Sequence, residues 1–238
     1  QSPTHNLLPF EDFDVAARAT IVGGTRMLSR ALTAGPGDYD LFIAWLDPAA
    51  PRATPPRVAH RAVSLPIART AGLATSDVIL ADRVAARAEP YPPSEQASHP
   101  YAIGPMELTL NRLRRFNRED DLSIVFQVIN AQATDTGMPD VTVNIRIVKV
   151  AGDRETPALN PHVYNATTLG PDFNLHLGHP LFAAVTAPLA SLSRGDYRLK
   201  ISVTDKMAGT NTSTDADFSI AATPSSLLAD APPLARPF

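Results

Sequence analysis

The chain contains the same short phrase twice, and this repeat constrains the fold more than any other feature. Residues 37–47 and 195–205 share a glycine, an aspartate, a tyrosine, a leucine, an isoleucine and a final aspartate in the same register. Solenoid repeats recur every 20 to 50 residues or so, a much shorter period than the separation of these copies. The phrase therefore predicts a turn and a buried strand at equivalent places in two related β modules.

Composition favours short strands and excludes several kinds of site. The chain has 238 residues, of which 23 are proline and 12 are glycine, and proline disfavours long helices. A net charge of −3 provides no basic surface for nucleic acid. Cysteine is absent, which excludes disulfides, a thiol nucleophile and a thiolate metal site. No apolar run approaches the roughly 18 residues that span a bilayer, so no transmembrane segment is expected.

Residues 101–222 are predicted to form a C-terminal immunoglobulin-like β-sandwich. Alternating apolar residues indicate strands near 106–110, 122–129, 141–147, 181–185, 197–203 and 216–220, about the number that such a sandwich needs. The loop 130–140 suggests a hairpin with a long connection between its two flanking strands. Tyr197 follows a Gly-Asp turn at the start of a late strand, where this fold class places a tyrosine corner.

Residues 1–84 are predicted to form a second, incomplete β module. Candidate strands run over 13–22, 26–33, 39–46 and 58–65, which are few for a closed sandwich. Residues 85–100 are rich in proline and charge and are interpreted as a semi-rigid linker. Residues 223–238 carry four prolines and are interpreted as an extended tail. The fold class is therefore all-β, with two immunoglobulin-like modules.

The strand carrying the first copy of the phrase is apolar on both faces. Tyr39, Leu41, Ile43 and Trp45 alternate with Phe42, Ala44 and Leu46, whereas the corresponding face of the second copy carries Arg198, Lys200, Ser202 and Thr204. We expect both faces to be covered, by the second module, by residues 77–84 or by another chain. The candidate interface consists of Tyr39, Phe42, Ala44 and Leu46.

Several short sequence segments resemble the C-terminal immunoglobulin-like region of exported bacterial von Willebrand factor A-related and GWxTD-type proteins. They occur in the order of that family at residues 72–84, 100–104, 115–116, 124–130, 136–140, 178–182, 188–192 and 195–206. The resemblance implies a β-rich region with an extracytoplasmic location and no assigned activity. The Asp-x-Ser-x-Ser run through which a von Willebrand A domain holds its metal is absent from this chain.

No cofactor, metal or catalytic residue is expected. His162, His176 and His179 are possible ligands, but no acidic partner stands at a diagnostic interval. The acids Glu119, Asp120, Asp121, Asp135 and Asp140 lack calcium-loop spacing and are interpreted as solvated turns. No Gly-x-Ser-x-Gly turn is present for a serine nucleophile.

The sequence therefore predicts a non-enzymatic, extracytoplasmic bacterial protein that binds other protein subunits. An accessory or scaffold subunit of an envelope or membrane-associated complex is the leading hypothesis. The alternative is a carbohydrate-binding module, for which Tyr91, Tyr101 and Tyr164 in predicted loops are the available aromatic residues.

Overall fold

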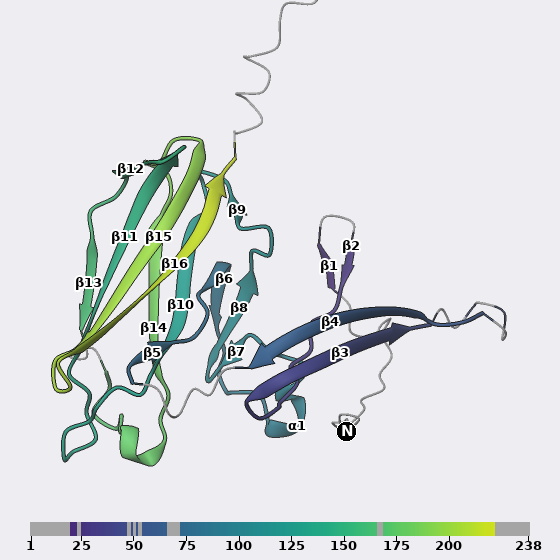
Figure 1. Ribbon diagram of the computed structural model, residues 1–238, viewed down its shortest axis with the longest axis horizontal. Helices are drawn as coiled ribbons and strands as arrows, with labels where there is room; N and C mark the ends of the chain where they lie inside the picture. The colour runs from purple at the N-terminus through teal and green to yellow at the C-terminus, as the bar shows by residue number, and fades with distance from the viewer. Residues whose placement is uncertain are drawn as a thin grey trace, which may run out of the picture. The chain divides into compact units, whose positions relative to one another are not determined.

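The chain divides into two units, each with β-sheets in its described part. The computed structural model describes residues 20–22, 25–46, 49, 51, 54–65, 72–165 and 169–221. One unit comprises Gln1–Thr70 with Pro92–Pro100, and the other comprises Ala71–Tyr91 with Tyr101–Phe238. The described residues are mostly in strands, which confirms the predicted all-β class (Figure 1).

The C-terminal unit contains two sheets. The first has the order β14-β10-β6-β8-β7, with β5 also paired to β10, and the second has the order β12-β11-β15-β16-β9, with β13 also paired to β11. The strands of the first sheet are β5 (Ala74–Thr75), β6 (Ile79–Ala86), β7 (Ala102–Ile103), β8 (Met106–Leu110), β10 (Asp121–Ile129) and β14 (Leu181–Pro188). Those of the second are β9 (Arg115–Phe116), β11 (Val141–Ala151), β12 (Arg154–Pro157), β13 (His162–Asn165), β15 (Gly195–Asp205) and β16 (Thr210–Ile220).

One hydrophobic core lies between these sheets. In β15 every second residue from Tyr197 to Val203 is buried, and the residues between them are more exposed. The inward residues of β10 and β11 meet them in the same cluster. The chain passes from β10 in one sheet to β11 in the other, returns to β14, and crosses again to β15. This alternation between two sheets around one core is an immunoglobulin-like sandwich, as predicted.

The predicted hairpin around residues 130–140 is wrong. β10 and β11 belong to different sheets and do not pair. Each strand carries an apolar face because the two faces oppose each other across the core, and the intervening loop spans the gap between the sheets.

Both copies of the repeated phrase form the same tyrosine corner. The Tyr197 hydroxyl donates to the Ser193 carbonyl at 2.6 Å, and the Tyr39 hydroxyl donates to the Gly35 carbonyl at 2.7 Å. The glycine two residues before each tyrosine has φ of +146° at Gly195 and +151° at Gly37, a region that residues with a side chain rarely adopt. The predicted role of Tyr197 is therefore confirmed, and the first copy repeats it.

The outer face of the second sheet carries a charged network. The Arg198 guanidinium contacts the Asp217 carboxylate at 2.7 Å and the Glu155 carboxylate at 3.1 Å. The Lys200 ammonium lies 2.5 Å from the other oxygen of Glu155. The hydrogen bond from Lys200 lowers the pKa of Glu155, and that from Arg198 lowers the pKa of Asp217.

The N-terminal unit is built from two two-stranded sheets in its described part. β1 (Thr20–Val22) pairs with β2 (Thr25–Met27), and β3 (Gly37–Trp45) pairs with β4 (Arg57–Leu65). The short helix α1 (Pro93–Gln96) belongs to the same unit. The predicted strand over 13–22 is described only from residue 20, and the predicted tail 223–238 lies outside the described residues.

The boundary between the units differs from the predicted one. β6 pairs with β10 and β8, so residues 79–84 belong to the C-terminal sandwich. Leu80 and Ala81, on opposite faces of β6, are both buried, because an inner strand is covered on both sides. The pattern of residues 77–84 was compatible with either module, and only the strand pairing decides between them.

The predicted linker over 85–100 is also divided between the units. The Arg87 guanidinium lies 3.6 Å from the centre of the Tyr91 ring and 3.4 Å from the Glu107 carboxylate, within the C-terminal unit. Ala31 N–H donates to the Ala97 carbonyl at 2.8 Å, which ties the end of the segment to the N-terminal unit.

The tyrosine corner should contribute measurably to the stability of the sandwich. Tyr197→Phe leaves the Ser193 carbonyl without the hydroxyl donor, and we expect a loss of about 1–3 kcal/mol in the free energy of unfolding. Urea unfolding followed by far-UV circular dichroism measures it. Ser193→Ala keeps the carbonyl and is the matched control, with an expected loss below about 1 kcal/mol. Equal midpoints for Tyr197→Phe and the wild type would contradict the role of the corner.

The charged network should stabilise the sandwich only above acidic pH. The folded-state pKa of Glu155 lies below its ordinary value of 4.5, so its contribution is complete above pH 4.5 and is lost as the pH falls through the lowered value. Glu155→Gln should therefore lower the thermal midpoint at pH 7, and the difference from the wild type should shrink at pH values below 4.5. Asp140→Asn, which removes a single exposed ion pair with Lys206, should have a smaller effect at pH 7. If the thermal midpoint of Glu155→Gln stays equally far below that of the wild type at low pH, ionisation of Glu155 is not the cause of the difference.

Candidate protein-binding surface

The hairpin β3–β4 contains the candidate interface. Its register runs without interruption from Gly37 opposite Leu65 to Trp45 opposite Arg57. Among the described residues, no third strand pairs with either edge of this hairpin (Figure 1). An isolated two-stranded ribbon of this kind is at best marginally stable in water. Within the described part of the chain, both edges of the hairpin are therefore unpaired.

Large apolar side chains are exposed on both faces of the hairpin. Phe42 is 65% exposed on one face, and Trp45 is 47% exposed on the other. Leu46, just beyond β3, is 60% exposed, and Ala44 is also exposed. The sequence predicted apolar faces correctly, but we expected both to be covered. Residues 77–84, one of the three proposed covers, are part of the C-terminal sandwich instead.

Tyr39 differs from the other residues of the candidate interface. It is half-buried, and its hydroxyl is engaged with the Gly35 carbonyl at the corner. Tyr39 also stands on the opposite face of β3 from Phe42 and Ala44, because side chains alternate along a strand. Its role in the described structure is to set the start of the strand.

The face carrying Phe42 is organised by a histidine on β4. His60 lies directly opposite Phe42, and their rings stack with centres 4.7 Å apart and planes 18° from parallel. The His60 Nε2 lies 2.7 Å from the Asp40 carboxylate. The stacked pair is continued by Val58, which is 57% exposed and lies opposite Ala44. This face is thus an apolar patch that includes one hydrogen-bonded histidine–aspartate pair.

The other face combines apolar and cationic side chains. Ile43 and Trp45 stand on β3, and the residues opposite Leu41 and Trp45 on β4 are Arg61 and Arg57. Both arginines are exposed. Ile43, Trp45 and Val58 are not among the four residues of the predicted candidate interface. Only their exposure in the folded chain identifies them as surface residues.

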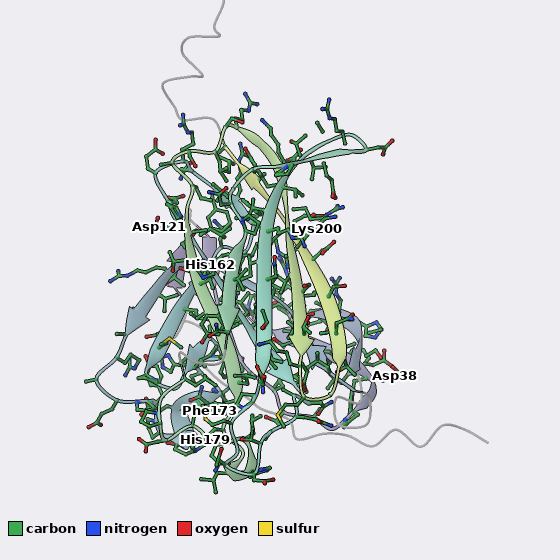
Figure 2. All side chains as sticks on the ribbon, turned by 90° about the vertical axis from the view of Figure 1, so that its left-hand side faces the viewer. Asp38, Asp121, His162, Phe173, His179 and Lys200 are labelled. Carbon is green, nitrogen blue, oxygen red and sulfur yellow. The ribbon has the colours of Figure 1, made fainter. Side chains whose placement is uncertain are left out.

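The three histidines considered as metal ligands do not assemble into a site. His176 Nε2 lies 3.0 Å from the Thr134 carbonyl, and His179 Nδ1 accepts a hydrogen bond from the Asn174 N–H at 3.1 Å. His162 stands in β13, away from His179, which packs against Phe173 (Figure 2). Within the described part of the chain, no three histidine or acidic side chains are grouped to hold a metal ion.

Two of the acids considered for calcium have other partners. The Asp120 carboxylate accepts hydrogen bonds from the backbone N–H and the side-chain amide of Asn117, at 2.6 and 3.1 Å. Asp140 pairs with Lys206 at 3.1 Å. These contacts are those of a capped turn and a surface ion pair.

The histidine-bearing loop is held by Asn174 and Gly137. The Asn174 side-chain oxygen accepts from the backbone N–H groups of His176 and Leu177, at 2.8 and 3.3 Å. Gly137 has φ of +82°, and a Cβ placed on it would lie 2.0 Å from that oxygen. Glycine is therefore required at residue 137 both by its backbone and by the close approach of Asn174.

This close approach gives a test of how the loops are held. Gly137→Ala should displace Asn174 from its two backbone donors, and we expect a loss of more than about 2 kcal/mol in the free energy of unfolding. Gly209→Ala is the matched control, because Gly209 also has a positive φ of +65° but nothing lies within 4 Å of its added Cβ. Its loss should stay near 1 kcal/mol. Thermal unfolding measures both, and equal losses would contradict the role of Asn174.

The tyrosines considered for carbohydrate stacking are used inside the C-terminal unit. The Tyr91 hydroxyl lies 3.1 and 3.2 Å from the two Glu107 carboxylate oxygens, and its ring lies under Arg87. Tyr101 packs on the smaller apolar cluster, and Tyr164, which is in β13 and not in a loop, packs on the main core. These three rings form no exposed aromatic platform.

Comparison with known proteins gives distant structural likenesses only. No family model and no curated protein matches the chain. The chain is similar to the crystal structure of an immunoglobulin-like protein from Pseudomonas aeruginosa, at 10% identity over 61% of this chain and 98% of that chain, with a TM-score of 0.28. A likeness of this size carries no conclusion about function, and the immunoglobulin-like assignment rests on strand order and core. Among the described residues, no helix has the length and apolar character needed to span a membrane.

Proposed function

We propose that this protein is a non-enzymatic binding protein that contacts other protein subunits through the hairpin β3–β4. The observation that supports this most strongly is the exposure of Phe42, Trp45 and Leu46 on a ribbon whose edges pair with no other described strand. Exposed apolar side chains gathered on one element are typical of interaction sites. A partner that covers them removes apolar surface from water and stabilises a hairpin that is marginal alone.

The charges on the hairpin support a partner with acidic groups. Arg57 and Arg61 stand on the same face as Ile43 and Trp45, so the surface that receives this face is apolar with acidic groups at its edge. The opposite face offers Phe42 and Val58 for apolar contact, with the hydrogen-bonded pair of His60 and Asp40 beside them. The partner in this proposal is a protein that encloses the hairpin on both faces.

The proposed location is outside the cytoplasm, in a bacterial envelope or membrane-associated complex. The support is the resemblance of residues 35–222 to the C-terminal region of exported bacterial von Willebrand factor A-related proteins. The proposed role is that of an accessory or scaffold subunit.

Paired substitutions on each face test the proposal. Phe42→Ser with Leu46→Ser removes one apolar face, and Ile43→Ser with Trp45→Ser removes the other. Each pair should reduce the partner recovered by mild cross-linking from envelope membranes at least tenfold, equivalent to about 1.4 kcal/mol of binding free energy. Leu113→Ser, at an 86% exposed apolar residue of the C-terminal unit, is the matched control and should leave recovery unchanged.

The outcomes separate the alternatives. Equal recovery of the same proteins with both pairs and with the wild type would place binding elsewhere and overturn the proposal. Loss with only one pair would reduce the interface to one face. Far-UV circular dichroism of each variant checks that the sandwich is intact, which we expect because all four positions are exposed.

A further inference from the structure

Among the described strands, β14 has a neighbour on one side only. It pairs with β10 from Leu181 opposite Val128 to Pro188 opposite Asp121. No described strand pairs with its other side, which is the edge of the first sheet. Every second residue of an antiparallel strand directs its N–H and C=O groups away from the partner, so half of the backbone groups of β14 face this edge.

Between Pro180 and Pro188, this edge lacks the features that usually prevent pairing. The residues of β14 are Leu, Phe, Ala, Ala, Val, Thr, Ala and Pro, with no charged side chain among them. Exposed edges are normally interrupted by charges, bulges or very short strands. The edge strand β12 of the second sheet follows that rule, since it has four residues and includes Arg154 and Glu155. β14 is twice as long and uncharged.

The two faces of β14 restrict how another strand joins it. Leu181 and Ala183 are buried in the main core, and Val185 and Ala187 pack against it at the edge. Phe182 points to the opposite side and packs on the smaller cluster. If a second copy of β14 adds in antiparallel direction, inward residues must lie opposite inward residues, because a shift by one residue reverses the faces. The two-fold axis must then pass through a residue and not between two residues.

The flanking prolines select that residue. Pro180 and Pro188 stand at equal distances on either side of Ala184. Proline has no N–H to donate to a ladder, so pairing stops at both positions. An axis through Ala184 places Leu181 opposite Ala187 and Ala183 opposite Val185, so that each larger side chain meets a smaller one. Phe182 meets Thr186 on the other face.

We infer that two copies of this chain associate by antiparallel pairing of their β14 strands about a two-fold axis at Ala184. The pairing joins the first sheets of two sandwiches into one continuous sheet and satisfies the exposed backbone groups of both edges. The contact is isologous, since the same residues are used by both copies. It is independent of the proposed function, because the hairpin β3–β4 belongs to the other unit.

Disulfide cross-linking tests the register directly, because the chain has no cysteine of its own. Ala184→Cys places two thiols directly opposite each other, where paired Cα atoms are about 4.5–5.5 Å apart, within disulfide range. Thr186→Cys places its two copies about 14 Å apart along the strands, too far to bridge. Ser213→Cys, at an exposed position of β16, measures cross-linking by random collision.

The expected result is rapid, complete cross-linking of Ala184→Cys by mild oxidation, with Thr186→Cys and Ser213→Cys at the same slow rate. Cross-linking of Ala184→Cys at the Ser213→Cys rate would overturn the inference. Faster cross-linking of Thr186→Cys than of Ala184→Cys would move the two-fold axis to Thr186 and overturn the inferred register.

Charge substitution at the axis gives a second test in the cysteine-free chain. Ala184→Lys places two like charges opposite each other and should shift the dimer to monomer in a sedimentation series over concentration, as should Ala184→Glu. Mixing the two variants places opposite charges together and should restore the dimer. A wild-type chain that is monomeric over the whole series, or a mixture that stays monomeric, would contradict the pairing.

Discussion

The structure depends on the alternation of buried and exposed residues along β15. This strand pairs with β11 on one side and β16 on the other, and its inward residues from Tyr197 to Val203 lie at the centre of the main core. The Gly195 turn and the Tyr197 hydroxyl set where the alternation begins. A shift of one residue would bury Arg198 and Lys200 and expose the apolar face. The corner therefore acts on the register of a whole sheet.

The same corner leads to a different result in the N-terminal unit. Tyr39 repeats the hydroxyl contact and Gly37 repeats the backbone conformation, but β3 is paired only with β4 among the described strands. The corner determines how a strand starts. It does not supply the second sheet that would bury the strand's apolar face. This difference is why a local motif shared by both units is compatible with a core in one and an exposed ribbon in the other.

The two proposed contacts are stabilised by different interactions. The hairpin β3–β4 offers apolar side chains, so its binding free energy comes from removing surface such as that of Phe42 and Trp45 from water. The edge of β14 offers unpaired backbone groups, so its association comes from completing a hydrogen-bonded ladder. Substitutions of side chains on the hairpin and of Ala184 on the edge therefore affect the two contacts separately.

The sequence alone predicted the strands of the C-terminal sandwich, because period-two alternation reports directly on which residues face a core. It also predicted the corner at Tyr197, since a Gly-Asp-Tyr turn is a local motif. It did not assign residues 79–84 to the correct unit or keep β10 and β11 in separate sheets, because strand pairing joins residues that are distant in the chain. The exposure of Ile43 and Trp45 and the free edge of β14 were likewise decided by tertiary structure, since an apolar residue has the same identity whether or not another strand covers it.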